Sequence, residues 1–161
     1  AIFLDFDRFD PHAERRQRAG KKIAIAAEIG TRMFFPNTVN TAESSIYATK
    51  GQGRGIQVPT TTLSHIFEEH AIMSCNFLKL DCEGAEYEIL FSTPSSCLKK
   101  IEKITMECHN PSYFNISNPQ YNQKSMKMFL QSNGFVVKEV KENAMHSLLF
   151  AWRDDIANQR I

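Results

Sequence analysis

The chain has 161 residues, of which 42% are hydrophobic and 23% are charged, with 7 glycines and 6 prolines. This composition is close to the average for globular proteins, so it excludes disordered, collagen-like and low-complexity classes. The 19 basic and 18 acidic residues leave a formal net charge of +1. That balance gives no electrostatic reason to expect nucleic acid or an anionic membrane as the main partner.

The length predicts a single domain over 1–161, because domains typically hold about 100–200 residues. No apolar run approaches the ~20 residues that span a bilayer, so we expect a soluble chain, cytoplasmic by default. The chain starts inside an apparent strand, without Met or a signal peptide, which indicates a processed or truncated product. Free thiols are expected at four positions that form no C-x-x-C pair: Cys75, Cys82, Cys97 and Cys108.

The first third of the chain predicts two strands and one helix. Ile2 to Leu4 is a short apolar run that predicts a strand, and the polar stretch from Asp10 to Arg18 predicts a helix. Ile23 to Ala26 predicts a second, buried strand. Turn-forming residues interrupt the pattern from Gly30, and a polar, irregular segment is expected as far as Gly55.

The middle of the chain predicts a helix, a strand and a second helix. Thr60 to Thr62 supply helix-cap oxygens for a short amphipathic helix from Leu63 to His70. Asn76 to Asp81 is a nearly continuous apolar run, typical of a parallel strand covered on both faces. A helix from Ala85 to Phe91 follows directly.

The last third predicts a strand, a helix and a closing pair of strands. The strand is Lys103 to Glu107, and the helix is Asn122 to Asn133 with Met126, Phe129 and Leu130 facing inward. The closing strands are Val136 to Val140 and Ser147 to Trp152. Strands that alternate with helices indicate an α/β sheet, with the final pair added to its edge as an antiparallel hairpin.

Polar residues follow the apolar part of three predicted strands. They are Asp5 and Asp7, then Asp81 and Glu83, then Glu107 and His109. Ligands of open α/β sheets bind outside the carboxyl ends of the strands. If the strands that end near Asp81 and Glu107 are neighbours, carboxylates and an imidazole face one crevice.

Three of these positions also have a structural alternative. Asp81 and Glu83 can accept hydrogen bonds from the start of the helix near Gly84, and His109 can be a structural residue at the beginning of a loop. Lys79 projects from an otherwise apolar strand on the same side as Asp81. A buried lysine needs an anionic partner, so we predict that Lys79 pairs with a crevice carboxylate.

Other sequence features carry less weight. Suitable metal ligands are Asp81, Glu83, Glu86, Glu107 and His109, but their spacing matches no dedicated motif, so no metal site is predicted. Four other histidines have no partner that the sequence identifies: His12, His65, His70 and His146. The glycines at 51–55 are not a dinucleotide fingerprint, because no helix follows them. Arg54 in this loop is either solvated or a clamp for an anionic substrate group.

Three segments share the pattern of a known enzyme family. They are Val58 to Leu63, Phe77 to Leu90 and Met106 to His109. The central segment contains apolar-Lys-apolar-Asp-x-Glu-Gly-Ala-Glu at positions 78–86, with every fixed position met. In these segments the chain resembles the FkbM-type S-adenosylmethionine-dependent methyltransferases. The flanks, Ile2 to Gly20 and Val136 to Trp152, agree more loosely.

The resemblance implies a Rossmann-like class I methyltransferase sheet, mostly parallel, that binds S-adenosylmethionine. It implies O-methylation of a hydroxyl group on a sugar or other small metabolite. The implied catalytic residues are Asp81, Glu107 and His109. The implied cofactor-binding residues are Asp5, Asp7, Asp81, Glu83 and Gly84, with an aspartate after the second strand accepting hydrogen bonds from the ribose. Glu86 and Arg54 are the implied residues for binding the acceptor.

The chain departs from the family at its start, because the family's glycine-rich turn after the first strand has no counterpart upstream of Ile2. Either the first strand-helix unit is absent, or Ile2 to Leu4 is the first strand and Asp5 to Phe9 replaces the turn. A methyltransferase is therefore one hypothesis, and an inactive remnant that serves as a binding module is another. A metal-dependent hydrolase that uses the carboxylates is a third. Open sheet edges also leave a homo-oligomer as an alternative.

Overall fold

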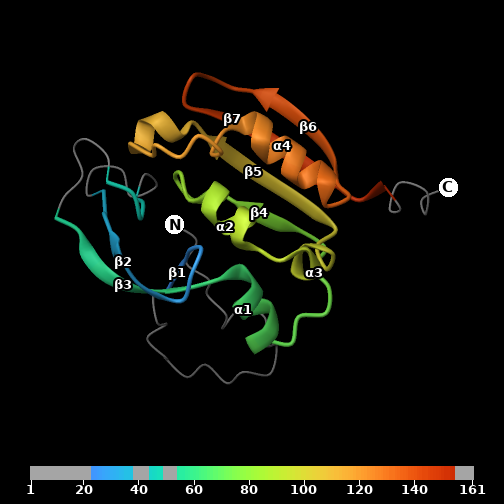
Figure 1. Cartoon of the computed structure of the whole chain (residues 1–161), viewed down its shortest axis with the longest axis horizontal. Coiled ribbons are helices and arrows are strands. Elements are labelled where there is room, and N and C mark those ends of the chain that lie inside the picture. The colour runs from blue at the N-terminus through green and yellow to red at the C-terminus, as the bar shows by residue number, and fades with distance from the viewer. Residues whose placement is uncertain (1–22, 38–43, 49–53, 155–161) are drawn as a thin grey trace.

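The computed structural model describes residues 23–37, 44–48 and 54–154, which form two β-sheets with helices beside them (Figure 1). The strand expected at Ile2 to Leu4 and the helix expected at Asp10 to Arg18 lie outside the described residues. No helix in the described part of the chain is long and apolar enough to cross a membrane.

The first sheet has three strands, β1 (Ala24–Ile25), β2 (Gly30–Phe34) and β3 (Ile56–Thr61), in the order β1-β3-β2. The strand predicted over Ile23 to Ala26 is confirmed as β1, which runs parallel to β3. β2 pairs with β3 in antiparallel orientation. The prediction of an irregular segment that begins at Gly30 is wrong, because β2 starts there.

β3 was not predicted from the sequence. Pro59 makes this strand hard to recognise, because proline in a central strand removes a ladder hydrogen bond. The structure accommodates it because β1 pairs only with Thr60 and Thr61. Pro59 therefore lies where β3 has β2 as its strand neighbour, opposite Thr31. Val58 and Thr60 are buried and Pro59 between them is exposed, which is the alternation of a strand with one covered face.

The second sheet has four strands in the order β4-β5-β7-β6. They are β4 (Leu78–Leu80), β5 (Lys103–His109), β6 (Val136–Lys141) and β7 (His146–Trp152). β4 and β5 are parallel neighbours, and the closing strands form the predicted antiparallel hairpin. β7 also pairs with β5 in antiparallel orientation. The prediction of one mostly parallel sheet is therefore wrong for the described residues, which form two mixed sheets.

The predicted helices are confirmed with small shifts at their ends. They are α1 (Leu63–Glu69), α2 (Glu86–Ser92) and α4 (Gln123–Ser132). The Thr62 side chain caps α1 by accepting a hydrogen bond from the His65 backbone N–H at 3.1 Å. Asn122 caps α4 in the same way. Two short helices were not predicted, α3 (Ser95–Leu98) and the 3₁₀ helix η3 (Pro111–Phe114).

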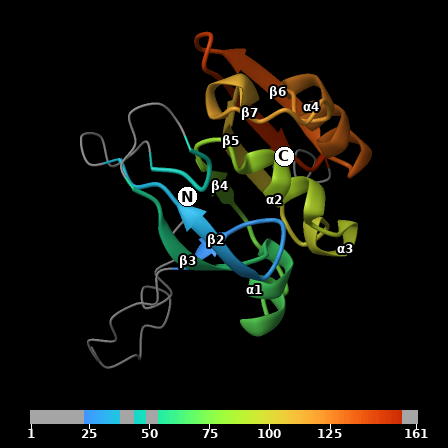
Figure 2. The same cartoon turned by 60° about the vertical axis from the view of Figure 1, so that its left-hand side comes forward.

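α2 and α4 lie on one face of the four-stranded sheet (Figures 1 and 2). Met126 and Leu130 of α4 are fully buried, as predicted, whereas Phe129 is only partly buried. The prediction that the strand over Asn76 to Asp81 is covered on both faces is wrong. Phe77 is 58% exposed and the Lys79 side chain 64% exposed, because β4 is a short strand with β5 as its only partner among the described strands.

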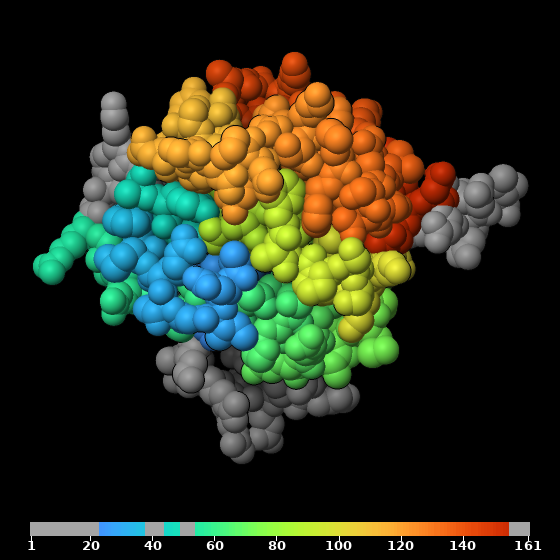
Figure 3. All heavy atoms as spheres, in the orientation of Figure 1, coloured from blue at the N-terminus to red at the C-terminus, as the bar shows by residue number. Residues whose placement is uncertain are grey.

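Glu88 on α2 connects this helix to the first sheet. Its buried carboxylate accepts hydrogen bonds from the Tyr47 hydroxyl and, at 3.3 Å, from the Ala27 backbone N–H. The Arg32 guanidinium on β2 lies 3.6 Å from the same carboxylate. Figure 3 shows α2 in yellow-green between the blue β1–β2 segment and the orange α4, on one continuous surface. The Glu88 contacts therefore join the two sheets through α2.

Replacing Glu88 with alanine tests this connection. Glu88→Ala removes a buried acceptor from Tyr47, Ala27 and Arg32, so we expect the free energy of unfolding to fall by about 2–4 kcal/mol in urea denaturation. Glu69→Ala is the matched control, because Glu69 is a 60% exposed glutamate on α1, and we expect a change below about 0.5 kcal/mol. Equal losses in the two variants would contradict the bridging role of Glu88.

Candidate active site

The turn that joins β4 to α2 has an unusual backbone. Glu83 has a φ of 51° and Gly84 a φ of 99°, both in the left-handed region. A Cβ atom at position 84 would lie 2.8 Å from Cγ of Phe114 in η3. Position 84 therefore requires glycine for two reasons, the sign of φ and the close approach of the Phe114 ring.

Glu86 holds this turn and an imidazole at the same time. Its side chain has no exposed surface. Its carboxylate accepts hydrogen bonds from the backbone N–H groups of Cys82 at 2.8 Å and Gly84 at 3.1 Å. His109 Nδ1 lies 3.0 Å from Oε1 of the same carboxylate. Because an ionised carboxylate only accepts, Nδ1 is the donor and the orientation of the His109 ring is fixed.

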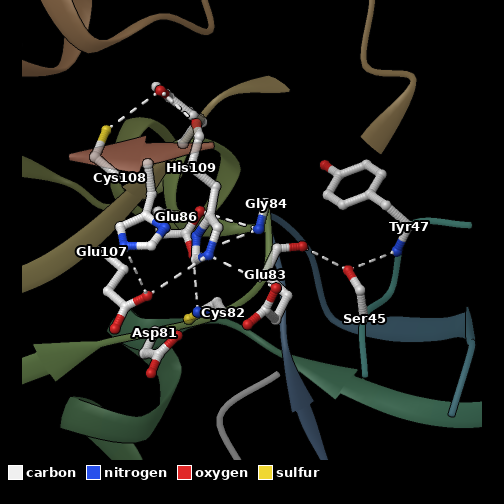
Figure 4. Close-up of polar contacts among 12 residues, drawn as sticks. Ser45, Tyr47, Asp81, Cys82, Glu83, Gly84, Glu86, Glu107, Cys108 and His109 are labelled. Atoms are coloured by element: carbon white, nitrogen blue, oxygen red, sulfur yellow. Dashed lines mark hydrogen bonds and ion pairs between the residues drawn. The ribbon is translucent and has the colours of Figure 1, made fainter. Parts of the chain in front are cut away.

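The other ring nitrogen of His109 faces two carboxylates (Figure 4). Nε2 lies 3.6 Å from Oε2 of Glu83 and 3.8 Å from Oε2 of Glu107. Glu107 and His109 are two residues apart on β5, so their side chains leave the strand on the same face. Only 5% of the His109 side chain is exposed. The strand pair therefore presents carboxylates and an imidazole together, as the sequence predicted for neighbouring β4 and β5.

His146 joins this cluster from β7, where it pairs directly with His109 in the antiparallel register. Its Nε2 lies 3.8 Å from Oε2 of Glu107, and the two imidazole centroids are 5.5 Å apart. The sequence analysis gave His146 no role. The signal that identifies it is the register between β5 and β7, which brings together residues 37 positions apart in the chain.

Asp81 lies at the end of β4 with its side chain 35% exposed. The Lys79 ammonium is 3.5 Å from its carboxylate, so the predicted pairing of Lys79 with a crevice carboxylate is confirmed. The reason given for it is wrong, because Lys79 is exposed and its ion pair is a surface contact worth at most about 1 kcal/mol. Asp81 also lies close to Glu83 and His109, with donor atoms within 4.8 Å of one another.

The charges of the cluster change how its members titrate. Burial by itself would lower the pKa of His109, but the hydrogen bond to Glu86 and the charges of Glu86, Glu83 and Asp81 raise this pKa from 6.5 to about 9. Burial raises the pKa of Glu83 from its usual value, although the charge of His109 opposes the rise. At neutral pH the site therefore holds an imidazolium among carboxylates.

The structure bears differently on the other site predictions. Arg54 is exposed just before β3 and is not among the contacts of the cluster. Asp5 and Asp7 are outside the described residues. Glu86, expected to help bind the acceptor, has no exposed surface, and its oxygens are taken by the turn and by His109. His109 was expected at the start of a loop, but β5 continues through it.

Comparison with known families gives a match that covers the turn and most of the cluster. The family model described as Methyltransferase FkbM domain matches residues 8–137. The chain belongs to the FkbM methyltransferase family. The resemblance drawn from the motif at positions 78–86 is thereby confirmed, and the whole cluster except His146 falls inside the matched region. Searches of curated proteins and of solved structures returned no significant match for this FkbM domain.

Gly84 provides a test of the turn. Gly84→Ala places a methyl group against Phe114 in a left-handed backbone conformation, so we expect a loss of about 2–3 kcal/mol in the free energy of unfolding. Gly30→Ala is the control, because a Cβ there meets nothing closer than 3.9 Å. A Gly84→Ala variant as stable as Gly30→Ala would contradict the geometry of the turn.

His109 makes stability depend on pH. Its folded-state pKa of about 9 exceeds the ordinary histidine pKa of 6.5, so its contribution to stability is complete below about pH 6.5 and is lost as the pH rises through about 9. We expect the difference in unfolding free energy between the unmodified chain and His109→Gln to shrink by at most about 3 kcal/mol over this interval. The measurement is urea denaturation with EDTA in the buffer. A difference that stays constant or grows with pH would contradict the raised pKa.

Proposed function

We propose that this FkbM domain is an S-adenosylmethionine-dependent O-methyltransferase that acts on a hydroxyl group of a sugar or other small metabolite. The observation that carries the proposal is the cluster at the carboxyl ends of the parallel strands β4 and β5. Asp81, Glu83, Glu107 and His109 meet there. Ligands of parallel strands bind at this end. Family membership supports methyl transfer and the use of S-adenosylmethionine.

The residues at the end of β4 suit this cofactor. S-adenosylmethionine supplies an electrophilic methyl group on a sulfonium cation. Asp81 is partly exposed, and Glu83 is held against His109, so both offer carboxylate oxygens to a positively charged ligand with N–H and O–H donors. Gly84 contributes a turn without a side chain. Asp5 and Asp7 stay predicted as acceptors for the ribose hydroxyls.

The cluster on β5 suits the acceptor hydroxyl, which must lose its proton during methyl transfer. In the proposal Glu107, whose side chain is 31% exposed, accepts this proton as general base. His109 presents positive charge at Nε2, because its pKa of about 9 keeps it protonated at neutral pH, and it stabilises the oxygen as its proton leaves. Glu86 acts through His109 as a positioning residue. Arg54 stays a prediction for an anionic group of the acceptor.

A Rossmann-like sheet is part of the same proposal. Among the described strands, β4 pairs with β5 and its other edge is open. Parallel strands buried in an α/β protein have neighbours on both edges unless they end the sheet. We infer that this open edge is where a further parallel strand of a Rossmann-like sheet would pair.

The first test of the function is binding of S-adenosylhomocysteine, measured by isothermal titration calorimetry. We expect saturable binding, weakened at least about tenfold in Asp81→Asn because an acceptor of charge-assisted hydrogen bonds is lost. Asp154→Asn is the matched control, since Asp154 is exposed just after β7, and it should bind like the unmodified chain. Absence of binding by the unmodified chain would overturn the proposal in favour of an inactive methyltransferase-like binding module.

A further inference from the structure

Glu107, His109 and His146 form a cluster of two imidazoles and one carboxylate on neighbouring strands. Their donor atoms all lie within 4.8 Å of one another. The backbone ladder fixes this grouping, because Glu107 and His109 share one face of β5 and His146 is paired directly with His109. Glu107 and His146 have side chains that are 31% and 20% exposed, so the cluster is accessible from one side.

The His109 ring is oriented as a metal ligand would be. Its Nδ1 donates to the buried carboxylate of Glu86, which two backbone N–H groups hold in place. Only 5% of the His109 side chain is exposed, and Nε2 lies beyond hydrogen-bond distance from the two carboxylates it faces, at 3.6 and 3.8 Å. Histidine ligands of metal ions usually donate their other nitrogen to a carboxylate in this way.

The charge around the cluster favours a cation with more than one positive charge. Four carboxylates surround the His109 ring. Glu83, Glu86 and Glu107 lie within 3.8 Å of its nitrogens, and Asp81 groups with Glu83 and His109, with donor atoms within 4.8 Å of one another. Lys79 contacts Asp81 on the outside of β4. A divalent ion bound at Nε2 of His109 would lie close to several carboxylate oxygens, and this proximity favours its binding.

The donor set indicates which class of ion fits. Two imidazoles with one carboxylate suit Zn²⁺, Co²⁺, Fe²⁺ and Mn²⁺, whereas Mg²⁺ and Ca²⁺ prefer oxygen ligands. A bound ion about 2.0–2.2 Å from each donor requires donors about 3–3.5 Å apart. Oε2 of Glu107 lies 3.8 Å from Nε2 of each imidazole, and all three donors lie within 4.8 Å of one another. Shifts of up to about 1 Å in the partly exposed Glu107 and His146 side chains would bring the donors to these separations.

We propose that Glu107, His109 and His146 bind one divalent transition-metal ion, with Glu86 orienting His109. The binding site rests on its own geometry. Its use in catalysis rests on the proposed function: with an ion bound, the positive charge opposite the acceptor oxygen would come from the ion, and Glu107 would serve as a ligand instead of the general base. A metal ion at that position lowers the pKa of a bound hydroxyl and so assists its deprotonation.

The test is a titration of the full 161-residue chain with Co²⁺, followed by visible absorption, and with Zn²⁺, followed by calorimetry. We expect one equivalent to bind and the d–d bands of Co²⁺ to show nitrogen and oxygen ligands. His146→Gln and Glu107→Gln should each weaken binding at least about tenfold. His65→Gln is the matched control, because His65 forms a similar His–Glu pair with Glu69 at 3.8 Å on α1, away from the cluster.

Three results would overturn the site. One is no saturable binding of either ion, and another is binding that His146→Gln and Glu107→Gln leave unchanged while circular dichroism shows folded protein. The third is binding abolished by Asp81→Asn and Glu83→Gln alone, which would move the ion to the neighbouring set of Asp81, Glu83 and His109. S-adenosylhomocysteine binding by the same proteins is measured separately, so failure of the metal site is distinguished from failure of the methyltransferase assignment.

Discussion

The buried carboxylate of Glu86 is the group on which both the turn and the site depend. Burying a carboxylate without partners costs several kcal/mol, so this side chain is stable only with its donors in place. The donors come from two backbone N–H groups of the turn and from His109 at the end of β5. One interaction therefore fixes the start of α2, the left-handed turn before it and the orientation of the imidazole.

Glu86 and Glu88 divide the two tasks of α2 between opposite sides of the helix. Residues two positions apart on a helix do not face each other. Glu86 accordingly points to the turn and to β5, whereas Glu88 reaches Tyr47 and Arg32 beside the three-stranded sheet. The two glutamates of α2 thus have separate structural roles: the helix that positions the imidazole is also the helix that joins the two sheets.

Local patterns in the sequence located much of the site. Asp81, Glu83, Glu107 and His109 were identified because each directly follows or ends an apolar run, and the strand register then brings them together. His146 could not be identified in this way. Its place beside His109 depends on the pairing of β5 with β7, and the offset between two strands separated by a helix and a hairpin is not encoded in either strand alone.

Two further features could not be predicted from the sequence, because they also depend on contacts between distant parts of the chain. The sequence marks Gly84 as a turn residue, but the ring of Phe114 that packs against it comes from η3, beyond β5. Lys79 looked buried because its neighbours are apolar, whereas the structure leaves it exposed on a short strand with one partner among the described strands. The hydrophobic pattern predicts which face of a strand a side chain lies on, but the neighbouring elements in the fold decide whether that face is covered.

The segment 44–48 contacts the turn of the site directly. The Ser45 hydroxyl donates to the carbonyl oxygen of Glu83 at 2.6 Å and accepts from the backbone N–H of Tyr47 at 3.0 Å (Figure 4). Ser45 is fully buried, so these contacts are shielded from water. Because the Glu83 carbonyl belongs to the left-handed turn, any movement of this segment would be transmitted to the carboxylate that faces His109. The geometry around the imidazole is thus set jointly by the Glu86 contacts, which link α2, the turn and β5, and by the Ser45 contact from the segment 44–48.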